Sequence, residues 1–455
     1  MFWTIVKREL IDHLISLRFS AVFVLTILLM VISVSVFSVE YLDTLKEFQT
    51  VPGGLVGDDG KTSLTMLPCN GWGVHRAPSS LAFLAGEEDR QVPNLIETSL
   101  HNLHSIDREA KIGEVASGAL HVDWAQAVVL LLSFAAGLLT YKSVSGELRD
   151  GTLTLLLSNP VSKATLLAAK YLAALIALAV SLIVGILAAL VVLRMMGTVA
   201  LTPDDWMKIV LFALVSILFL SVFVSIGLAC SVFTKSPVIS AVTFLLVWTI
   251  IVFVLPNVGG IIANLTSSVH SPEHYKELAD AIPSNYSSRP GMDLREISAI
   301  QVQVQKARED LLLAYAYELL NQVSIGRNIT RLSPASAYSY AATEIAGLGT
   351  VRLQRFIANV VRYRENLFEA VILADKKDPQ SDHVYVPWRC GASNFSRQSV
   401  DLGTATQFID MPVPAADGLQ AATGDIVLLV IGNLILVVII FRRVAHMDVA
   451  QAPGV

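Results

Sequence analysis

The sequence predicts an all-α polytopic membrane protein with six transmembrane helices, an N-terminal interfacial helix and a large, mainly helical extracytoplasmic domain. Of its 455 residues, 54% are hydrophobic and only 16% are charged, and the mean hydropathy is +0.60. Soluble domains carry about 25% charged residues, so this composition indicates a membrane protein. The net charge is −5 without a basic block, which does not favour nucleic acid as a partner.

Six apolar runs are long enough to cross a bilayer, which takes roughly 20 residues. None of them contains Asp, Glu, Lys, Arg or His. Ion-coupled transporters usually keep ionisable groups inside their spans, so a gradient-driven transporter is disfavoured and a partner must supply the energy. The predicted spans, in order, are Phe19–Val39, Trp124–Tyr141, Tyr171–Leu193, Ile209–Phe233, Val238–Val254 and Ile426–Phe441.

In the termini and short loops that flank these spans, lysine and arginine collect on one side, whereas the one short loop on the other side offers Arg194 and Lys208. The residues on the first side are Lys7, Arg8, Arg18, Lys142, Arg149, Lys163, Lys170, Lys235, Arg442 and Arg443. The positive-inside rule then places both termini in the cytoplasm, and we expect the protein in a bacterial cytoplasmic (inner) membrane. Residues 40–123 and 256–424 become two extracytoplasmic segments, while residues 142–170 and 442–455 form a cytoplasmic loop and tail.

Residues 1–18 precede the first span and predict an amphipathic helix in the cytoplasmic interface. Trp3, Val6, Leu10, Leu14 and Leu17 recur at helical spacing, with charged residues turned elsewhere. The alternative is a secretory signal peptide. It is disfavoured because the apolar run that follows has the length of a span and no small-residue cleavage pattern follows it.

The second extracytoplasmic segment predicts a helical stalk. Apolar residues recur at intervals of three and four over 294–314 and again over 353–370, which favours two helices that pack on a neighbour. Asp293 and Glu296 predict a capping box at the start of the first helix. Between the two, Ser333-Pro334 predicts the start of a shorter helix that Gly347 and Gly349 end.

The first extracytoplasmic segment is less regular. Turn signals such as Pro52-Gly53-Gly54 predict short strands or irregular structure near Val51–Thr65. One helix is expected near Ile106–Gly118. Two of the three cysteines, Cys69 and Cys390, lie in different extracytoplasmic segments and are a candidate disulfide, whereas Cys230 is interpreted as an inert packed thiol.

No catalytic, cofactor or metal site is predicted in this chain. Residues 54–62 resemble a phosphate loop at a glance, but the first glycine lies one residue too far from Gly60-Lys61. The histidine pairs His101/His104 and His270/His274 lack a third metal ligand nearby, so we interpret them as surface histidines.

The cytoplasmic loop between spans 2 and 3 is polar and mostly helix-forming, so it presents a surface on which another protein can act. Gly151 allows a sharp turn or a close helix approach, and Pro160 can end or redirect the chain. The alternative is an ordinary solvated loop with snorkelling lysines. The residues predicted to couple the chain to a partner are Glu147, Arg149, Asp150, Gly151, Thr152, Leu153, Pro160, Lys163 and Lys170.

These residues also carry a resemblance to a family. The pattern Glu147-x-x-x-Gly151-Thr152-Leu153, the run from Leu155 to Lys163 and Lys170, with the N-terminal Lys7-Arg8-Glu9-Leu10, resembles the permease subunits of type-2 ABC exporters. In that family the loop is similar to the element that docks on the ATPase subunit. Lys163 stands where the family often has Arg, which keeps the positive charge.

A second match lies in the extracytoplasmic part. Arg331-Leu332-Ser333-Pro334, followed by residues 341–347, resembles the large-outer-loop branch grouped with the permeases of copper-enzyme (nitrous oxide reductase) maturation systems. That branch is functionally mixed, so its copper label does not transfer as a substrate.

The resemblance implies a subunit that lacks its own nucleotide site, so a cytoplasmic ABC ATPase partner would bind ATP and Mg. It also implies a second permease copy, as a homodimer, or a paralogous permease, and it leaves room for a periplasmic partner. Two functions stay open: the permease of an ATP-driven exporter, and an ATPase-driven force-transmitting scaffold that acts on an extracytoplasmic partner without substrate transport.

Overall fold

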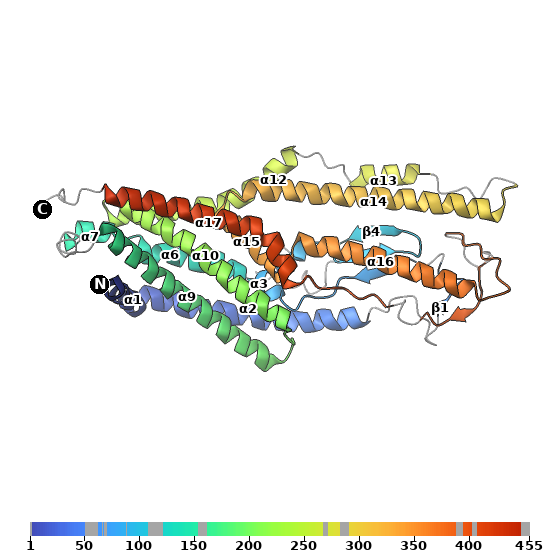
Figure 1. The fold of residues 1–455 in the computed structure, drawn as a ribbon, viewed down its shortest axis with the longest axis horizontal. Helices are drawn as coiled ribbons and strands as arrows, with labels where there is room; N and C mark the ends of the chain where they lie inside the picture. The colour runs from blue at the N-terminus through green and yellow to red at the C-terminus, as the bar shows by residue number, and fades with distance from the viewer. Residues whose placement is uncertain are drawn as a thin grey trace.

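The protein is an elongated molecule in which a bundle of long helices continues into a narrower, mainly helical domain (Figure 1). The computed structural model describes residues 2–50, 62–65, 67, 71–87, 89–107, 122–152, 162–266, 272–282, 291–387, 395–402 and 407–446. The first helix, α1 (Phe2–Ile15), and the end of the last helix, α17 (Ala415–Ala445), lie at the same end of the bundle, called the terminal end below.

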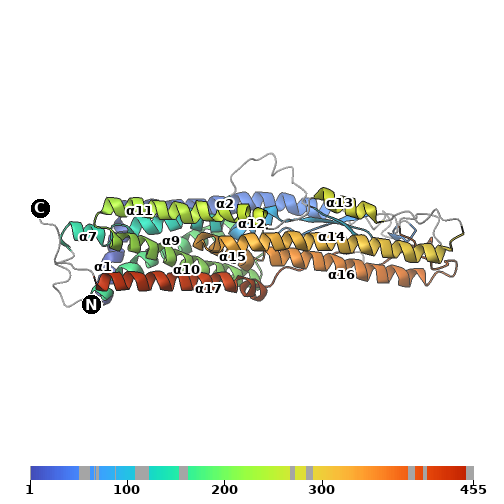
Figure 2. The same ribbon diagram turned by 90° about the horizontal axis from the view of Figure 1, so that it is seen from above.

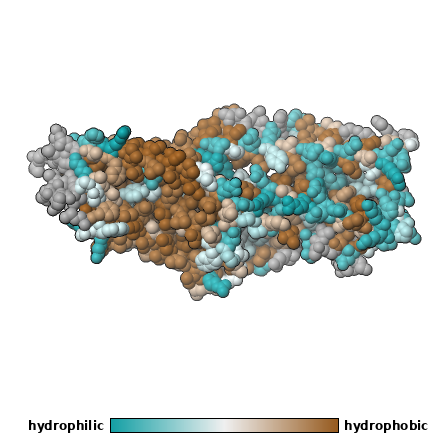
Figure 3. All heavy atoms as spheres, in the orientation of Figure 1, coloured by the Kyte–Doolittle hydropathy of each residue, from teal (hydrophilic) through white to brown (hydrophobic). Residues whose placement is uncertain are grey.

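Within the described residues, six helices are long and apolar enough to cross a membrane. They cover Leu17–Lys46, Trp124–Arg149, Lys163–Met196, Pro203–Phe233, Pro237–Gly259 and Ala415–Ala445. Each contains one of the six predicted spans, so the prediction of an all-α polytopic membrane protein is confirmed. A space-filling view shows hydrophobic side chains over the bundle and mostly hydrophilic ones over the other half (Figure 3).

Several of these helices begin and end where local signals place them. α9 (Lys163–Met196) is capped by the Ser162 side chain and ends at Gly197, whose φ of +63° suits glycine. α10 (Pro203–Phe233) begins with a capping box between Thr202 and Asp205. α11 (Pro237–Thr249) has Pro237 in its first turn, where the missing N–H of proline costs no helical hydrogen bond.

The second span is built from shorter pieces. α5 (Trp124–Ala127), the π-helical segment η2 (Val128–Leu132) and α6 (Ser133–Thr140) run in sequence and are followed by a turn and the short helix α7 (Ser145–Arg149). The first span is the long helix α2 (Leu17–Thr50), and the indole N–H of Trp124 donates to the carbonyl of Met30 at 3.2 Å.

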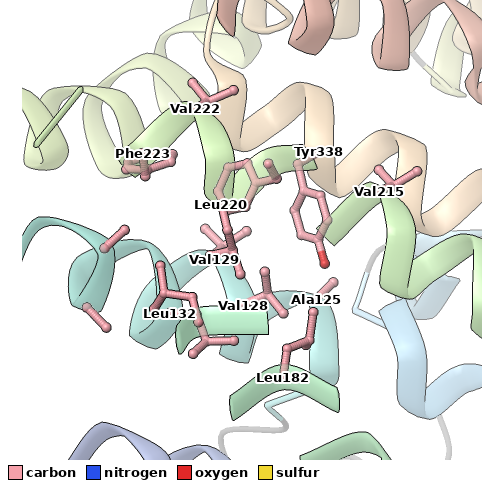
Figure 4. Close-up of a cluster of buried hydrophobic side chains, with 14 of the residues drawn as sticks. Ala125, Val128, Val129, Leu132, Leu182, Val215, Leu220, Val222, Phe223 and Tyr338 are labelled. Atoms are coloured by element: carbon pink, nitrogen blue, oxygen red, sulfur yellow. The ribbon is translucent and has the colours of Figure 1, made fainter. Parts of the chain in front are cut away.

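α10 lies at the centre of the bundle and packs against α6, α9, α11, α15 and α17. A close-up shows its side chains Val215, Leu220, Val222 and Phe223 beside those of η2 and Tyr338 (Figure 4). α17 is seated on α10 by a polar contact as well as by packing. Asn433 donates to Ser221 Oγ at 2.8 Å and accepts from Ser225 Oγ at 2.7 Å.

Beyond the bundle lies the part we call the stalk domain, made of the strands β1–β5 and the helices α13 (Pro272–Ala281), α14 (Leu294–Thr330) and α16 (Thr350–Asp375). The two predicted stripes form α14 and α16, which are joined by a buried ion pair between Glu309 and Arg364. The two helices run side by side along the stalk domain (Figure 2). Asp293 is the N-cap of α14 as expected, but its carboxylate accepts from the N–H of Leu294 and not from that of Glu296, so the predicted capping box does not form.

The short helix α15 (Pro334–Ala346) joins α14 to α16 and has the predicted ends. Ser333 caps it, and Gly347 ends it with a φ of +74°. α15 packs with the bundle and not with the stalk domain. It contacts α10 and α17, and its Tyr338 is fully buried among bundle residues. The Tyr338 ring stacks on Phe219, and its hydroxyl lies 2.7 Å from Ser216 Oγ.

Strands complete the stalk domain. β2 (Trp72–His75), β3 (Leu95–Thr98) and β4 (Leu103–Asp107) form an antiparallel sheet in that order, with Trp72 opposite Thr98. β1 (Thr62–Ser63) pairs with β5 (Ser399–Val400), which joins the two sequence segments of the domain. Short helical turns α3 (Ala82–Ala85) and η1 (Asp89–Gln91) lie between β2 and β3.

One sequence expectation about this region is wrong at its start. Ile106, the first residue of the helix expected near Ile106–Gly118, lies in β4, where it pairs with Ile96 of β3. Residues 108–121 lie outside the described residues. The strand forms because Leu103–Asp107 finds a partner strand, which the local sequence does not reveal.

Candidate functional site

The loop that the sequence singles out begins with a turn held in place by two other spans. Ser231 Oγ of α10 accepts hydrogen bonds from the backbone N–H groups of Val144 and Ser145, at 2.9 and 3.0 Å. The hydroxyl of Ser240 in α11 donates to the carbonyl of Tyr141 at 2.6 Å. The turn between α6 and α7 is therefore fixed to α10 and α11 and cannot move without them.

Lys170 is the centre of a buried group of three charges that we call the ion triad: Glu9, Glu147 and Lys170. Lys170 Nζ lies 2.8 Å from Glu9 Oε1 and 2.7 Å from Glu147 Oε1, and the lysine side chain is only 3% exposed. Both contacts are charge-assisted hydrogen bonds, which are stronger than neutral ones. The triad ties together α1, α7 and α9, which are far apart in sequence.

The helix α1 packs along α9 beside the triad. Val6 is buried against Ala169 and Ala173, whose small side chains allow the two helices to approach closely. Trp3, which lies one turn before Val6, is 69% exposed, and Ile15 is 77% exposed. Only part of the predicted apolar face is therefore covered by the protein, and the place of this helix in the cytoplasmic interface stays a prediction.

The end of α7 presents an exposed turn. Arg149 Nε and Asp150 Oδ1 lie 3.0 Å apart, and their side chains are 62% and 56% exposed. Gly151 follows with a φ of +71°, a left-handed conformation that glycine adopts most readily, as the predicted sharp turn requires. The hydroxyl of Thr152 donates to the carbonyl of Glu147 at 3.4 Å, which closes the turn.

The predicted coupling residues therefore divide into two groups. Glu147 and Lys170 are brought together in the triad, whereas Arg149, Asp150, Gly151 and Thr152 form the exposed turn beside it. Lys163 is the first residue of α9. Leu153 and Pro160 lie outside the described residues.

Sequence reasoning did not assign Glu9 to this site. The residue stands in the N-terminal helix, 161 positions before Lys170. Its sequence signal is its place in the stretch Lys7-Arg8-Glu9-Leu10, which carries part of the family resemblance but does not point to Lys170. The oxygen Oε2 of Glu147 is buried and has no hydrogen-bond partner among the described residues. The triad is thus rich in negative charge, with two carboxylates about one ammonium.

At the opposite end of the bundle, ion pairs connect the stalk domain to α17. Arg331 binds Asp425 through Nε and Nη2, at 2.6 and 3.1 Å, and the Asp425 side chain is fully buried. Arg355 of α16 pairs with Asp417 of α17. Glu344 of α15 receives Arg327 of α14 at 3.0 Å. The motif around Arg331–Pro334 is thus the junction between the stalk and the last span.

His101 and His104 lie at the three-stranded sheet of the stalk domain, where they are partly buried and not at the surface as interpreted from the sequence. His101 Nδ1 is 2.6 Å from the Tyr385 hydroxyl, and burial lowers the pKa of His101 to about 3. Among the described residues, no three His, Cys, Asp or Glu side chains are grouped in a way that could hold a metal ion. Cys69 and Cys390, like His270, lie outside the described residues.

Comparison with known families adds the decisive observation. The model of the ABC-2 family transporter proteins matches residues 3–374, which is most of the chain and includes the ion triad and the exposed turn. The chain belongs to the ABC-2 transporter family. No curated protein matches it.

Membership gives the chain a general role. A protein of the ABC-2 family is a membrane permease component of an ABC transporter. The six long apolar helices found among the described residues make this chain a multi-pass membrane protein. Permeases of this family work with an ATPase subunit and in dimeric arrangements in general.

Proposed function

We propose that this ABC-2 protein is the permease of an ATP-driven exporter, and that residues 147–152 couple it to a separate cytoplasmic ATPase subunit. The observation that carries the proposal is the ion triad. It joins α1, α7 and α9 at the terminal end and leaves the turn of Arg149 to Thr152 exposed beside it. A partner that pushes on this turn would move three helices as one unit.

Contacts described above provide a route from this turn to the stalk domain. Ser231 links the start of α7, which carries the exposed turn at its other end, to α10, and α10 packs on α15 and α17. The pairs Arg331–Asp425 and Arg355–Asp417 then link α17 to α14 and α16. A displacement at the terminal end would therefore reach the stalk domain through packed helices and buried charges.

The finer features of the proposal follow from the sequence. Both termini lie in the cytoplasm, the stalk domain is extracytoplasmic, and the permease pairs with a second copy or a paralogous chain. The ATPase partner binds ATP and Mg. The motifs at residues 331–334 and 341–347 support membership of the large-outer-loop branch that includes the nitrous oxide reductase maturation permeases, and no copper substrate is inferred from it.

A second function is favoured by one specific observation. The stalk domain is joined to α17 by two ion pairs, and in one of them the carboxylate, that of Asp425, is fully buried. Such a firm junction suits a protein that transmits force to an extracytoplasmic partner without moving a substrate. ATP-dependent movement of a substrate into reconstituted vesicles separates the two functions, because only the exporter produces it.

The coupling role is tested by co-expression with the ABC ATPase subunit and purification through a tag on the permease. Arg149→Glu reverses a charge on the exposed turn, and we expect it to lower recovery of the ATPase at least tenfold, equivalent to about 1.4 kcal/mol. Glu147→Lys also places a second ammonium beside Lys170, so we expect a comparable loss. Membrane insertion should be unchanged for Arg149→Glu.

The matched control is Arg362→Glu, which makes the same charge reversal on the exposed face of α16 in the stalk domain. It should leave ATPase recovery unchanged. If Arg149→Glu recovers as much ATPase as the wild type, the exposed turn is not the docking site and the coupling role is refuted.

A further inference from the structure

The fifth span does not stop at the end of α11. It continues through the π-helical segment η3 (Ile250–Val254) into α12 (Leu255–Thr266), which bends away from the bundle (Figure 1). Pro256 lacks a backbone N–H and disrupts regular helical bonding, which accounts for the π segment just before it. The side-chain amide of Asn257 donates to the carbonyl of Phe253 at 2.7 Å and satisfies one carbonyl at the bend.

α12 has one packed face and one uncovered face. On the packed face Gly259 lies directly against Thr330 and Gly326 of α14, so closely that a Cβ atom would overlap them. On the opposite face Val258, Ile261 and Leu265 are 36%, 62% and 81% exposed. These three residues follow helical spacing, so they form a single apolar stripe.

This stripe continues the exposed stripe of the fifth span, where Leu246, Ile250 and Val254 are 61%, 49% and 48% exposed. Leu265 lies 28 residues beyond Pro237, which is ~42 Å along a straight helix. The hydrocarbon core is about 30 Å thick, and about 40–45 Å with the headgroups. With Pro237 taken as one edge of that core, Leu255, the first residue of α12, lies 18 residues or ~27 Å along the helix, near the other edge. Because α12 bends aside there, its stripe would lie at the boundary between acyl chains and headgroups.

A further exposed apolar side chain lies at the same end of the bundle. Leu332, in the turn between α14 and α15, is 80% exposed. Its neighbour Ser333 donates to the carbonyl of Ile251 at 2.6 Å. Ile251 lies 14 residues beyond Pro237, or ~21 Å along the helix, which is within the hydrocarbon core.

An independent contact agrees with this depth. Tyr338 of α15 lies beside Ser216, which is 17 residues, or ~26 Å, from the end of α10 at Phe233. The turn that carries Leu332 therefore lies beside the fourth and fifth spans, at a depth that would place it among lipid acyl chains.

We propose that α12 and the turn between α14 and α15, which lie at the base of the stalk domain, are immersed in the leaflet on the stalk side of the membrane, with lipid acyl chains covering Val258, Ile261, Leu265 and Leu332. If the orientation proposed above holds, this is the outer leaflet. The exposed side chains of α16 provide the contrast, since those at the surface of the stalk include Gln354, Arg362, Glu365, Asn366 and Glu369. Water solvates that face, whereas four large apolar groups gain by leaving water.

The test uses the full-length protein in native membranes with a photoreactive benzoylphenylalanine at Ile261, Leu265 or Leu332, one position at a time. Leu434, a 58% exposed residue in the middle of α17, is the control for lipid contact, and Leu373, 52% exposed on α16, is the control for water. After illumination, mass spectrometry identifies the phospholipid adducts, and gel mobility identifies cross-linked chains.

We expect phospholipid adducts at the three test positions with a yield close to that at Leu434 and several-fold above that at Leu373. Adducts to a second copy of the chain at Ile261 and Leu265 would overturn the proposal, because these residues would then form a dimer contact. A yield no higher than at Leu373 would also overturn it. The test needs no ATPase, so it stands apart from the coupling role.

Discussion

Removing the ammonium of the ion triad tests whether its three charges hold the coupling region together. Lys170→Met keeps most of the side-chain volume but leaves Glu9 and Glu147 facing each other. We expect this substitution to destabilise the packing of α1 and α7 on α9, and to lower recovery of the ATPase as a consequence. The prediction follows from geometry alone, since Lys170 is the cation that both carboxylates contact.

The magnitude can be worked from the two distances. Because Lys170 Nζ lies 2.8 Å from Glu9 Oε1 and 2.7 Å from Glu147 Oε1, these oxygens are at most 5.5 Å apart, the sum of the two. Two unit charges at that separation repel by about 3 kcal/mol at an effective dielectric constant of about 20. Breaking a buried pair typically costs about 3–5 kcal/mol. Since the carboxylate side chains are 19% and 21% exposed, we expect about 3 kcal/mol.

The assay is the free energy of unfolding in mixed micelles, measured for three variants. Lys170→Met should lose about 3 kcal/mol, whereas Glu147→Gln should lose much less because the Glu9–Lys170 pair remains. The neutral triple variant Glu9→Gln, Glu147→Gln, Lys170→Met has no charge left unpaired, so it should recover most of the loss.

Two results would refute this reasoning. If Lys170→Met unfolds with the free energy of the wild type, the triad contributes nothing to the packing of these helices. If the triple variant is as unstable as Lys170→Met, the loss comes from the side chain of Lys170 and not from the two carboxylates.

Two further predictions concern the stalk domain. Burial holds the pKa of His101 at about 3, against 6.5 in an unfolded chain, so the unfolded state binds the proton more readily between these values and stability is lost as the pH falls below 6.5. Between pH 7 and pH 5 the free energy of unfolding of the wild type should therefore fall by about 2 kcal/mol, and that of His101→Gln should fall by less. Denaturant titrations at the two pH values measure both changes, and equal losses would contradict this. Cys69 and Cys390 should form a disulfide, because Cys69 follows β1 and Cys390 precedes β5 in the sequence, and β1 and β5 pair with each other in antiparallel fashion. Non-reducing digestion should yield the linked peptides, and free, alkylatable peptides would contradict it.

The spans could be predicted from the sequence because their signal is local. A run of apolar residues without charge is sufficient to define a helix across the bilayer, and the ends of α15 follow from Ser333, Pro334 and Gly347 in the same way. The exposed turn could be anticipated for the same reason, since Gly151 marks it.

What the sequence could not supply depends on distant partners. Ile106 reads as the start of a helix, yet β3 pairs with it to form a strand. Glu9 and Lys170 meet only after α1 has packed along α9. α15 looks like part of the stalk by its place in the chain, but Tyr338 packs in the bundle core because α10 offers Phe219 and Ser216. In each case the residue's role is set by a neighbour from another part of the chain.

The burial of Asp425 has a consequence for how the protein is made. This carboxylate has Arg331 as its cation, and Arg331 is delivered by the long region that precedes the final helix in the chain. If the last helix settled before that region had folded, it would bring an uncompensated charge into an apolar setting, at a cost of several kcal/mol. We therefore expect an ordered biogenesis, in which the region that carries Arg331 folds first and the C-terminal helix then completes the molecule.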